Sequence, residues 1–292
     1  MLNRFQLKFL MLILMLLDHI AYFIPSAPQW FHLVGRVVAP VFFYLLVEGY
    51  LYTKNKSKYN KRLLIAAQIM FLGNTILSFI LPKTVNDKWQ VLDIGKRVES
   101  SLIEYIVLAC IITITIVSIY YVCKQKELRN KVALIMAFLL VLSNLVLRNL
   151  FKGQFLFINN IFLSMAFSLS MLRGIDSYKE TKNSKGAALA GLAFSFSAFT
   201  EALTIGPLMV LIFYFFKKEK VKMAIYYVLL SSIFLFGISG KAMINDPQWL
   251  MVFAIIFIFL YNGKKGKDLR YLFYIFYPVH IWLLYIISYF FT

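Results

Sequence analysis

Acidic residues and cysteines are scarce in this chain. Only 13 of 292 residues are Asp or Glu, against 31 Lys and Arg, and the formal net charge is +18. Cys110 and Cys123 are the only cysteines. They fall in one apolar run, on nearly opposite faces of the helix expected there, so they form neither a disulfide framework nor a metal site. We expect both to be packing residues.

Sequence motifs for several kinds of chemistry are also missing. There is no P-loop, no Rossmann glycine pattern, no HExxH and no GxSxG. ATP-driven pumping, hydride transfer and zinc proteolysis therefore have no support. No internal repeat is visible, which weakens a transporter built from inverted halves. No polar stretch is long enough to fold separately, so we expect one membrane domain over residues 1–292.

Long apolar runs dominate what is present. The chain is 61% hydrophobic with a mean hydropathy of +0.75. Runs of about 17–22 residues recur, close to the length that crosses ~30 Å of hydrocarbon, whereas barrel strands would be about ten residues with strict alternation. The sequence predicts an all-α polytopic integral membrane bundle of ten or eleven helices. The predicted spans are 5–24, 33–53, 63–81, 101–123, 132–149, 155–172, 187–200, 203–216, 223–239, 248–262 and 270–291.

The seventh and eighth spans are short and are interrupted by Glu201 and Gly206-Pro207. They form a hairpin, a re-entrant pair or one kinked helix. The hairpin puts 23 Lys and Arg on one side of the membrane and seven on the other, whereas a single crossing over 187–216 would put residues 217–220 outside, which favours the hairpin. Because basic residues concentrate in cytoplasmic loops, we expect a cytosolic N-terminus in a bacterial cytoplasmic membrane. The charge then anchors the protein, and no nucleic acid partner is expected. The first span is not followed by a small-residue cleavage site, so we expect it to be retained.

Ionisable residues inside the first two spans are the strongest functional signal, because such groups are costly in a membrane. Lys8 and His19 are eleven residues apart, so on a helix they share one face, roughly 16 Å apart along the axis. Asp18 precedes His19, and Arg36 lies at similar depth in the second span. An Asp18–Arg36 structural ion pair is the alternative to a functional role, and the two are compatible. His32 is expected to be interfacial.

Two further ionisable residues, His280 and Glu48, have two interpretations each. His280 lies in the middle of the last span, just after the helix-bending Pro278, and either lines a site or packs. Glu48 lies near the inner end of the second span, on the same side as Lys8 and Arg62. It either shapes a site or pairs with a nearby cation. Polar residues around the fifth and sixth spans are expected to form hydrogen bonds between helices. They are Asn144, Arg148, Asn159 and Asn160.

Several stretches together resemble the TraX family. In order, from about residue 7 to 283, they are LKFLMLILMLLDHIAYF, VGRVVAPVFFYLLVEGY, FINNIFLSMAFSL, LYNGKKGK and YLFYIFYPVH. The layout is also similar to that of the broader integral-membrane acyltransferase-three family. The first helix of that family carries a basic residue, ten residues and then an essential histidine. Lys8 and His19 match that pattern, with Lys in place of the commoner Arg.

TraX proteins are known for N-acetylating conjugative pilin subunits. The resemblance implies transfer of an acyl group, usually acetyl, from cytosolic acyl-CoA to a peptide, lipid or cell-envelope glycan, without a metal. His19 would act as the general base in a direct transfer. The second choice is that His19 carries the acyl group in an acyl-histidine intermediate. The alternative is a non-enzymatic transporter that uses intramembrane acids and His as a proton relay. The expected catalytic residues are Asp18, His19, Arg36, Glu48 and His280, and the expected contacts to acyl-CoA are Lys8 and Arg62.

Overall fold

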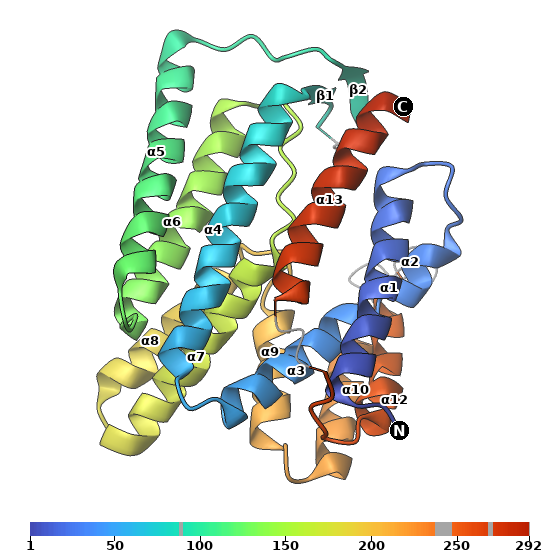
Figure 1. Cartoon of the computed structure of the whole chain (residues 1–292), viewed down its shortest axis with the longest axis vertical. Coiled ribbons are helices and arrows are strands. Elements are labelled where there is room, and N and C mark those ends of the chain that lie inside the picture. The colour runs from blue at the N-terminus through green and yellow to red at the C-terminus, as the bar shows by residue number, and fades with distance from the viewer. Residues whose placement is uncertain (88–89, 237–246, 268–270, 292) are drawn as a thin grey trace. The chain divides into compact units, whose positions relative to one another are not determined.

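A computed structural model describes residues 1–87, 90–236, 247–267 and 271–291 of the chain. Helices make up most of it, and the predicted all-α polytopic membrane bundle is confirmed (Figure 1). Six segments within these ranges are long and apolar enough to cross a bilayer. They are Arg4–Phe23, Trp30–Tyr52, Lys56–Ile80, Leu102–Lys124, Asn130–Leu150 and Leu272–Phe290. The number of crossings beyond these six stays a prediction.

Every predicted span falls on a helix, although the ends at 237–239 and 270 lie outside the described residues. The helices are α1 (Arg4–Phe23), α2 (Trp30–Gly35), α3 (Val38–Tyr52), α4 (Lys56–Ile80), α5 (Leu102–Lys124), α6 (Asn130–Leu150), α7 (Ile161–Thr181), α8 (Ser184–Ser197), α9 (Ile205–Phe215), α10 (Lys220–Phe236), the 3-10 helix η1 (Pro247–Phe253), α12 (Ala254–Leu260) and α13 (Leu272–Phe291).

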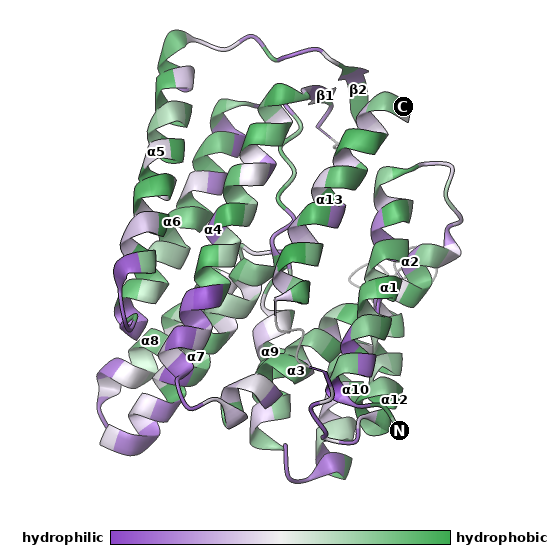
Figure 2. Cartoon of the chain, viewed as in Figure 1, coloured by the Kyte–Doolittle hydropathy of each residue, from purple (hydrophilic) through white to green (hydrophobic). Residues whose placement is uncertain are grey.

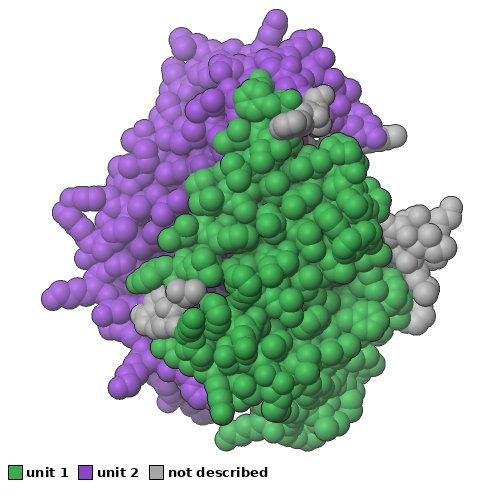
Figure 3. Space-filling view, turned by 45° about the vertical axis from the view of Figure 1, so that its right-hand side comes forward, with its two compact units in different colours: residues 1–51, 208–292 green, residues 52–207 purple. Residues whose placement is uncertain are grey.

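The chain forms two compact units, which Figure 3 colours separately. Unit 1 comprises residues 1–51 and 208–292, and unit 2 comprises residues 52–207. In unit 1, α1 packs against α2 and against α13 from the other end of the chain, while η1 contacts α2 and α10. In unit 2, α4 packs against α5, α6 and α7, and α7 also packs against α8. The expectation of one domain over residues 1–292 stays a prediction.

The buried centre of unit 2 is the first half of α7. Residues 161–172 are buried on every face of that helix. The close packing of α7 on α8 depends on small residues, because a Cβ added at Gly174 would come within 2.8 Å of backbone atoms of Ala190 and Gly186. The predicted span 155–172 begins too early, since the Asn160 side chain caps the helix by accepting from the Leu163 N–H at 3.3 Å.

The polar connection 82–99 holds a short hairpin that the sequence analysis did not predict. Strand β1 (Lys83–Val85) pairs antiparallel with β2 (Val91–Ile94), and Thr84 faces Asp93. The segment after α6 joins β1 from its other side, because the Val85 N–H donates to the Gly153 carbonyl at 2.7 Å. Gly153 has a φ of 86°, which only glycine adopts without strain. The long loop is therefore anchored to the helices of unit 2.

The predicted interruption between the seventh and eighth spans is confirmed. The chain leaves the helix after Ser197 and re-enters one at Ile205, which rules out one kinked helix across this stretch. Gly206-Pro207 lie in the first turn of α9, where the missing N–H of proline costs little. These two residues therefore do not cause the break, contrary to expectation. The hairpin stays a prediction.

The side chains of Cys110 and Cys123 are both exposed on α5. The expectation that they pack inside the bundle is therefore wrong. Both cysteines lie among exposed apolar side chains of α5, as is expected for a helix that borders lipid.

Candidate functional site

Two histidines from opposite ends of the chain contact each other in unit 1. Nδ1 of His19 on α1 lies 2.8 Å from Nε2 of His280 on α13. Both side chains are buried, with 9% and 5% of their surface exposed. The rings are stacked among aromatic side chains, with Phe276 parallel to His280 and Tyr277 edge-on to both imidazoles. The His19 side chain therefore faces the interior of unit 1. Its partner is His280, which was expected either to line a site or to pack.

The backbone fixes which nitrogen of each ring carries the proton. Nδ1 of His280 lies 2.7 Å from the Phe276 carbonyl oxygen, which only accepts, so Nδ1 of His280 is protonated. In the neutral ring Nε2 is then an acceptor, and Nδ1–H of His19 donates to it. The lone pair of His19 that is left for chemistry is therefore on Nε2.

Asp18 and Arg36 do not pair with each other, and the ion pair considered for them is wrong. Oδ1 of Asp18 lies 2.8 Å from Nδ1 of His32 on α2. Nη1 of Arg36 donates instead to Oε1 of Gln248 on η1 at 3.3 Å. Nε of Arg36 is buried without a hydrogen-bond partner. Asp18 and His32 therefore fasten α1 to α2, whereas Arg36 retains a donor for a further acceptor.

Glu48 is held by cations from two other segments of unit 1. Its carboxylate pairs with Lys217 and, at 3.4 Å, with Nη2 of Arg4. Nζ of Lys217 also donates to the Tyr44 hydroxyl at 2.8 Å and lies 4.3 Å from the centre of that ring. The Glu48 side chain is 4% exposed, so the pairing supplies the partner that a buried carboxylate requires. Burial and the charges of Lys220 and Arg4 lower the pKa of Lys217 to about 8.

A lysine-rich loop docks on the start of α1. The N–H of Leu2 donates to the Leu260 carbonyl at 2.7 Å, and the Arg4 N–H donates to the Lys264 carbonyl at 2.8 Å. Figure 2 shows the hydrophilic colouring of this connection between α12 and α13, and of the start of α10. Six exposed lysines lie within residues 217–222 and 263–267. They are Lys218, Lys220, Lys222, Lys264, Lys265 and Lys267. Unit 1 thus has a strongly basic end, where α1 begins.

The two residues predicted to contact acyl-CoA lie in different units. Lys8 is half-buried on α1, three turns before His19, as expected. Arg62 is on α4 in unit 2, with its guanidinium carbon 5.6 Å from the centre of the Tyr59 ring. Of the seven predicted site residues, six are in unit 1. Of these seven residues, His19 and His280 contact each other directly.

A comparison with family models covers the helices that carry this site. The family model described as TraX protein matches residues 3–151 and 136–288. The chain belongs to the TraX family. The two matches together run from the start of α1 to the last helix, and so include His19, Glu48 and His280. The TraX membership expected from the quoted motifs is confirmed.

One curated relative is a protein of Dichelobacter nodosus described as probable fimbrial assembly protein FimC, serogroup H1. It is 39% identical to the chain over 66 residues, which is 21% of this chain and 27% of that protein. The chain therefore spans about a quarter of the length of this relative. No solved structure matches the chain.

Three residues that pair with the predicted site residues were not predicted from the sequence. They are Arg4, His32 and Lys217. His32 was interpreted from its position beside Trp30 and Phe31 alone, although its spacing from Asp18 across a short turn was a usable signal. Lys217 was counted only as loop charge, and nothing in the sequence links it to a glutamate so far away.

Proposed function

We propose that this TraX protein is an acyl-CoA-dependent acyltransferase, with acetyl as the favoured group. The observation that carries the proposal is the His19–His280 contact, which leaves a basic nitrogen on a buried imidazole. Imidazole is the side chain best suited to accept a proton near neutral pH. A buried site also limits competing hydrolysis of a thioester.

The chemistry is a single acyl transfer. Nε2 of His19 removes the proton from an acceptor hydroxyl or amine as that group attacks the thioester carbonyl carbon. A new C–O or C–N bond forms, the C–S bond breaks, and the CoA thiolate leaves and takes up the proton from His19. The Nδ1–H of His19 donates more strongly to His280 while the ring is positively charged. His280 therefore acts as a positioning residue, and Arg36 is the proposed donor to the acyl carbonyl oxygen.

The basic end of unit 1 is the proposed entry for acyl-CoA. Phosphates are bound by charge-assisted hydrogen bonds from Lys and Arg. Lys8 lies on α1 between that end and His19, and Arg4, Lys217 and the 263–267 lysines surround the start of the helix. Glu48 orients Lys217 and Arg4. By the positive-inside rule this end faces the cytosol, in a bacterial cytoplasmic membrane, where CoA is available.

The proposed acceptor is a peptide, lipid or cell-envelope glycan. The Dichelobacter nodosus relative is described as a fimbrial assembly protein, which favours a substrate in the cell envelope. The proton-relay transporter would need Asp18 and Glu48 as exchanging acids. Asp18 is hydrogen-bonded to His32 and Glu48 is paired with Lys217 and Arg4, so we prefer the acyltransferase.

The test is incubation of the purified protein with radiolabelled acetyl-CoA and native membranes. We expect label in an acceptor with the wild-type protein and with Ser288→Ala, which alters a buried hydroxyl on α13 away from the histidine pair. We expect no label above background with His19→Ala. Full labelling by a folded His19→Ala protein, or no labelling with acetyl- or longer acyl-CoA, would overturn the proposal.

A further inference from the structure

His32 on α2 contacts the residue that precedes His19 on α1. Its Nδ1 lies 2.8 Å from Oδ1 of Asp18. A carboxylate oxygen only accepts, so Nδ1 of His32 carries a proton and is the donor. The side chains of His32 and Asp18 are 24% and 25% exposed, so the bond lies at the edge of the packed interior of unit 1. The reaction proposed above gives His32 no role.

Gly35 brings the backbone of α2 against the same aspartate. A Cβ added at Gly35 would lie 2.4 Å from Cβ and 2.5 Å from Cγ of Asp18, far closer than carbon atoms pack. Gly35 is buried and lies three residues after His32, so both are on one face of α2. The Asp18 side chain is therefore held between a hydrogen bond and a backbone surface.

The last helix holds the next residue of α1 from another direction. Nδ1–H of His19 donates to Nε2 of His280 on α13 at 2.8 Å. Consecutive residues of a helix diverge by about 100°, so α2 contacts one side of α1 through Asp18 and α13 contacts another side through His19. Two divergent contacts at the same depth fix the rotation of α1 about its own axis.

The bond between His19 and His280 is sensitive to that rotation. Side-chain atoms lie up to about 6 Å from a helix axis, so a rotation of about 20° moves them by about 2 Å. A hydrogen bond of 2.8 Å is lost after such a displacement. The imidazoles of His19 and His32 also interact electrostatically, which places the α2 contact near the proposed base.

We propose that His32 is a positioning residue for the acyl transfer. Through Asp18 it holds α1 at the rotation in which His19 meets His280, and Gly35 allows the close approach that this requires. His32 touches neither the donor nor the acceptor in this proposal. The inference rests on the proposed function, because it gives His32 a part in the same reaction.

The test records ¹⁵N NMR spectra of the purified full chain, labelled at histidine, in detergent. The chain has three histidines, so each ring is assigned by replacing one at a time. His32→Leu and Asp18→Ala break the α1–α2 bond from opposite sides. We expect each to move the signals of His19 Nδ1 and His280 Nε2 toward those of nitrogens without a hydrogen bond. His32→Asn keeps an N–H donor for Asp18 and is expected to preserve both signals.

Kinetics on the same variants distinguishes positioning from general stabilisation. Misplacing a catalytic group by about 1 Å costs about a hundredfold in rate, so we expect His32→Leu to lower kcat at least about tenfold. KM for acetyl-CoA is expected to change little, and His32→Asn is expected to restore most of the lost rate. Asp18→Ala and His32→Leu remove one bond, so the double variant should lose little more than either alone.

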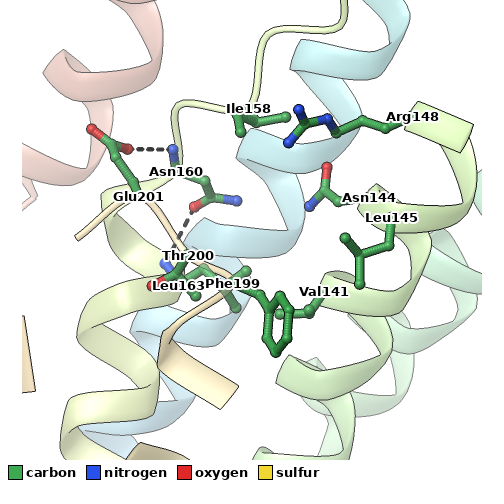
Figure 4. Close-up of a pocket in the computed structure, with 10 residues that line it drawn as sticks. All are labelled: Val141, Asn144, Leu145, Arg148, Ile158, Asn160, Leu163, Phe199, Thr200 and Glu201. Carbon is green, nitrogen blue, oxygen red and sulfur yellow. Dashed lines mark hydrogen bonds between the residues drawn. The ribbon is translucent and has the colours of Figure 1, made fainter. Parts of the chain in front are cut away.

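Two control variants change side chains outside this chain of contacts. Leu33→Ala alters an exposed residue of α2 beside His32. Asn144→Ser alters a polar side chain in unit 2, where it lines the small cavity that Figure 4 shows. Nδ2 of Asn144 donates to the Leu140 carbonyl of its own helix at 3.2 Å. Both controls are expected to keep wild-type histidine signals, and the melting temperature checks the folding of every variant.

Wild-type signals for His19 and His280 in a folded His32→Leu protein would overturn the inference. If that variant does not fold, the same result with Asp18→Ala would overturn it. Equal loss of kcat in His32→Asn and His32→Leu would also overturn it. The spectra need no acyl-CoA, so shifted signals in a wild-type-inactive protein contradict only the proposed acyl transfer. Wild-type transfer and signals in His32→Leu contradict only the role of His32.

Discussion

Nε2 of His280 lies 2.8 Å from Nδ1 of His19, and a backbone carbonyl fixes the proton on the other nitrogen of His280. This arrangement does for His19 what a carboxylate does for many catalytic histidines: it selects the tautomer and orients the ring. The partner is neutral, so His280 orients the base without adding a negative charge beside it.

We expect His280→Leu to reduce kcat by about a hundredfold with little change in KM for acetyl-CoA, because it removes the acceptor for Nδ1–H of His19. His280→Gln supplies an amide oxygen and is expected to restore part of that loss. Steady-state kinetics on both variants checks this. A purely structural role would lower the melting temperature and give equal kcat values for the two substitutions.

Glu48→Gln is expected to destabilise the protein by about 1–3 kcal/mol, since it leaves Lys217 and Arg4 without their shared carboxylate. The comparison variant is Glu219→Gln, which breaks an exposed pair with Lys222 and is expected to have no measurable effect. Thermal unfolding of both proteins in one detergent measures the difference. Equal melting temperatures for both variants would contradict the buried role of Glu48.

Binding of acyl-CoA is expected to weaken as the pH rises through about 8, where Lys217 loses its proton. Below that pKa the side chain is positive and attracts phosphate, and above it the side chain is neutral. The measurement is KM for acetyl-CoA between pH 7 and 9. Lys217→Arg should remove this dependence, because arginine stays charged throughout the range. A parallel rise in KM for both proteins would exclude Lys217 as its cause.

Gly266→Ala is expected to destabilise the protein by about 1–2 kcal/mol. Gly266 has a φ of 67°, and a Cβ there would lie 2.5 Å from Oδ1 of Asn3, the residue that caps α1. Gly191→Ala is the control, because a Cβ at that helical position meets nothing within 4 Å. Chemical or thermal unfolding of the two variants checks the difference, and an unchanged Gly266→Ala protein would contradict the docking of the loop on α1.

Apolar run length predicted where the helices lie, because crossing hydrocarbon imposes a minimum length that local sequence reveals. Helix starts were less predictable, as with α7, which begins at its Asn160 cap rather than at the first apolar residue. Local helix geometry separates Asp18 from His19, since consecutive residues diverge by about 100°, and the two side chains have different partners.

The contacts between side chains distant in the sequence could not be predicted. Asp18 contacts His32 and not Arg36 because of the way the six-residue helix α2 packs back against α1. The pairing of His280 with His19 depends on the packing of the last helix against the first. That packing is not encoded in spacing along the chain, so the sequence indicated His19 and His280 without indicating that they touch.

The backbone pairing of Leu2 and Arg4 with residues 260–264 has a consequence for how the protein is made. Chains are synthesised from the N-terminus, so α1 enters the membrane long before its anchoring loop and α13 exist. Until the ribosome has passed residue 280, His19 has no imidazole beside it. The contact between His19 and His280 can therefore form only after α13 has been synthesised.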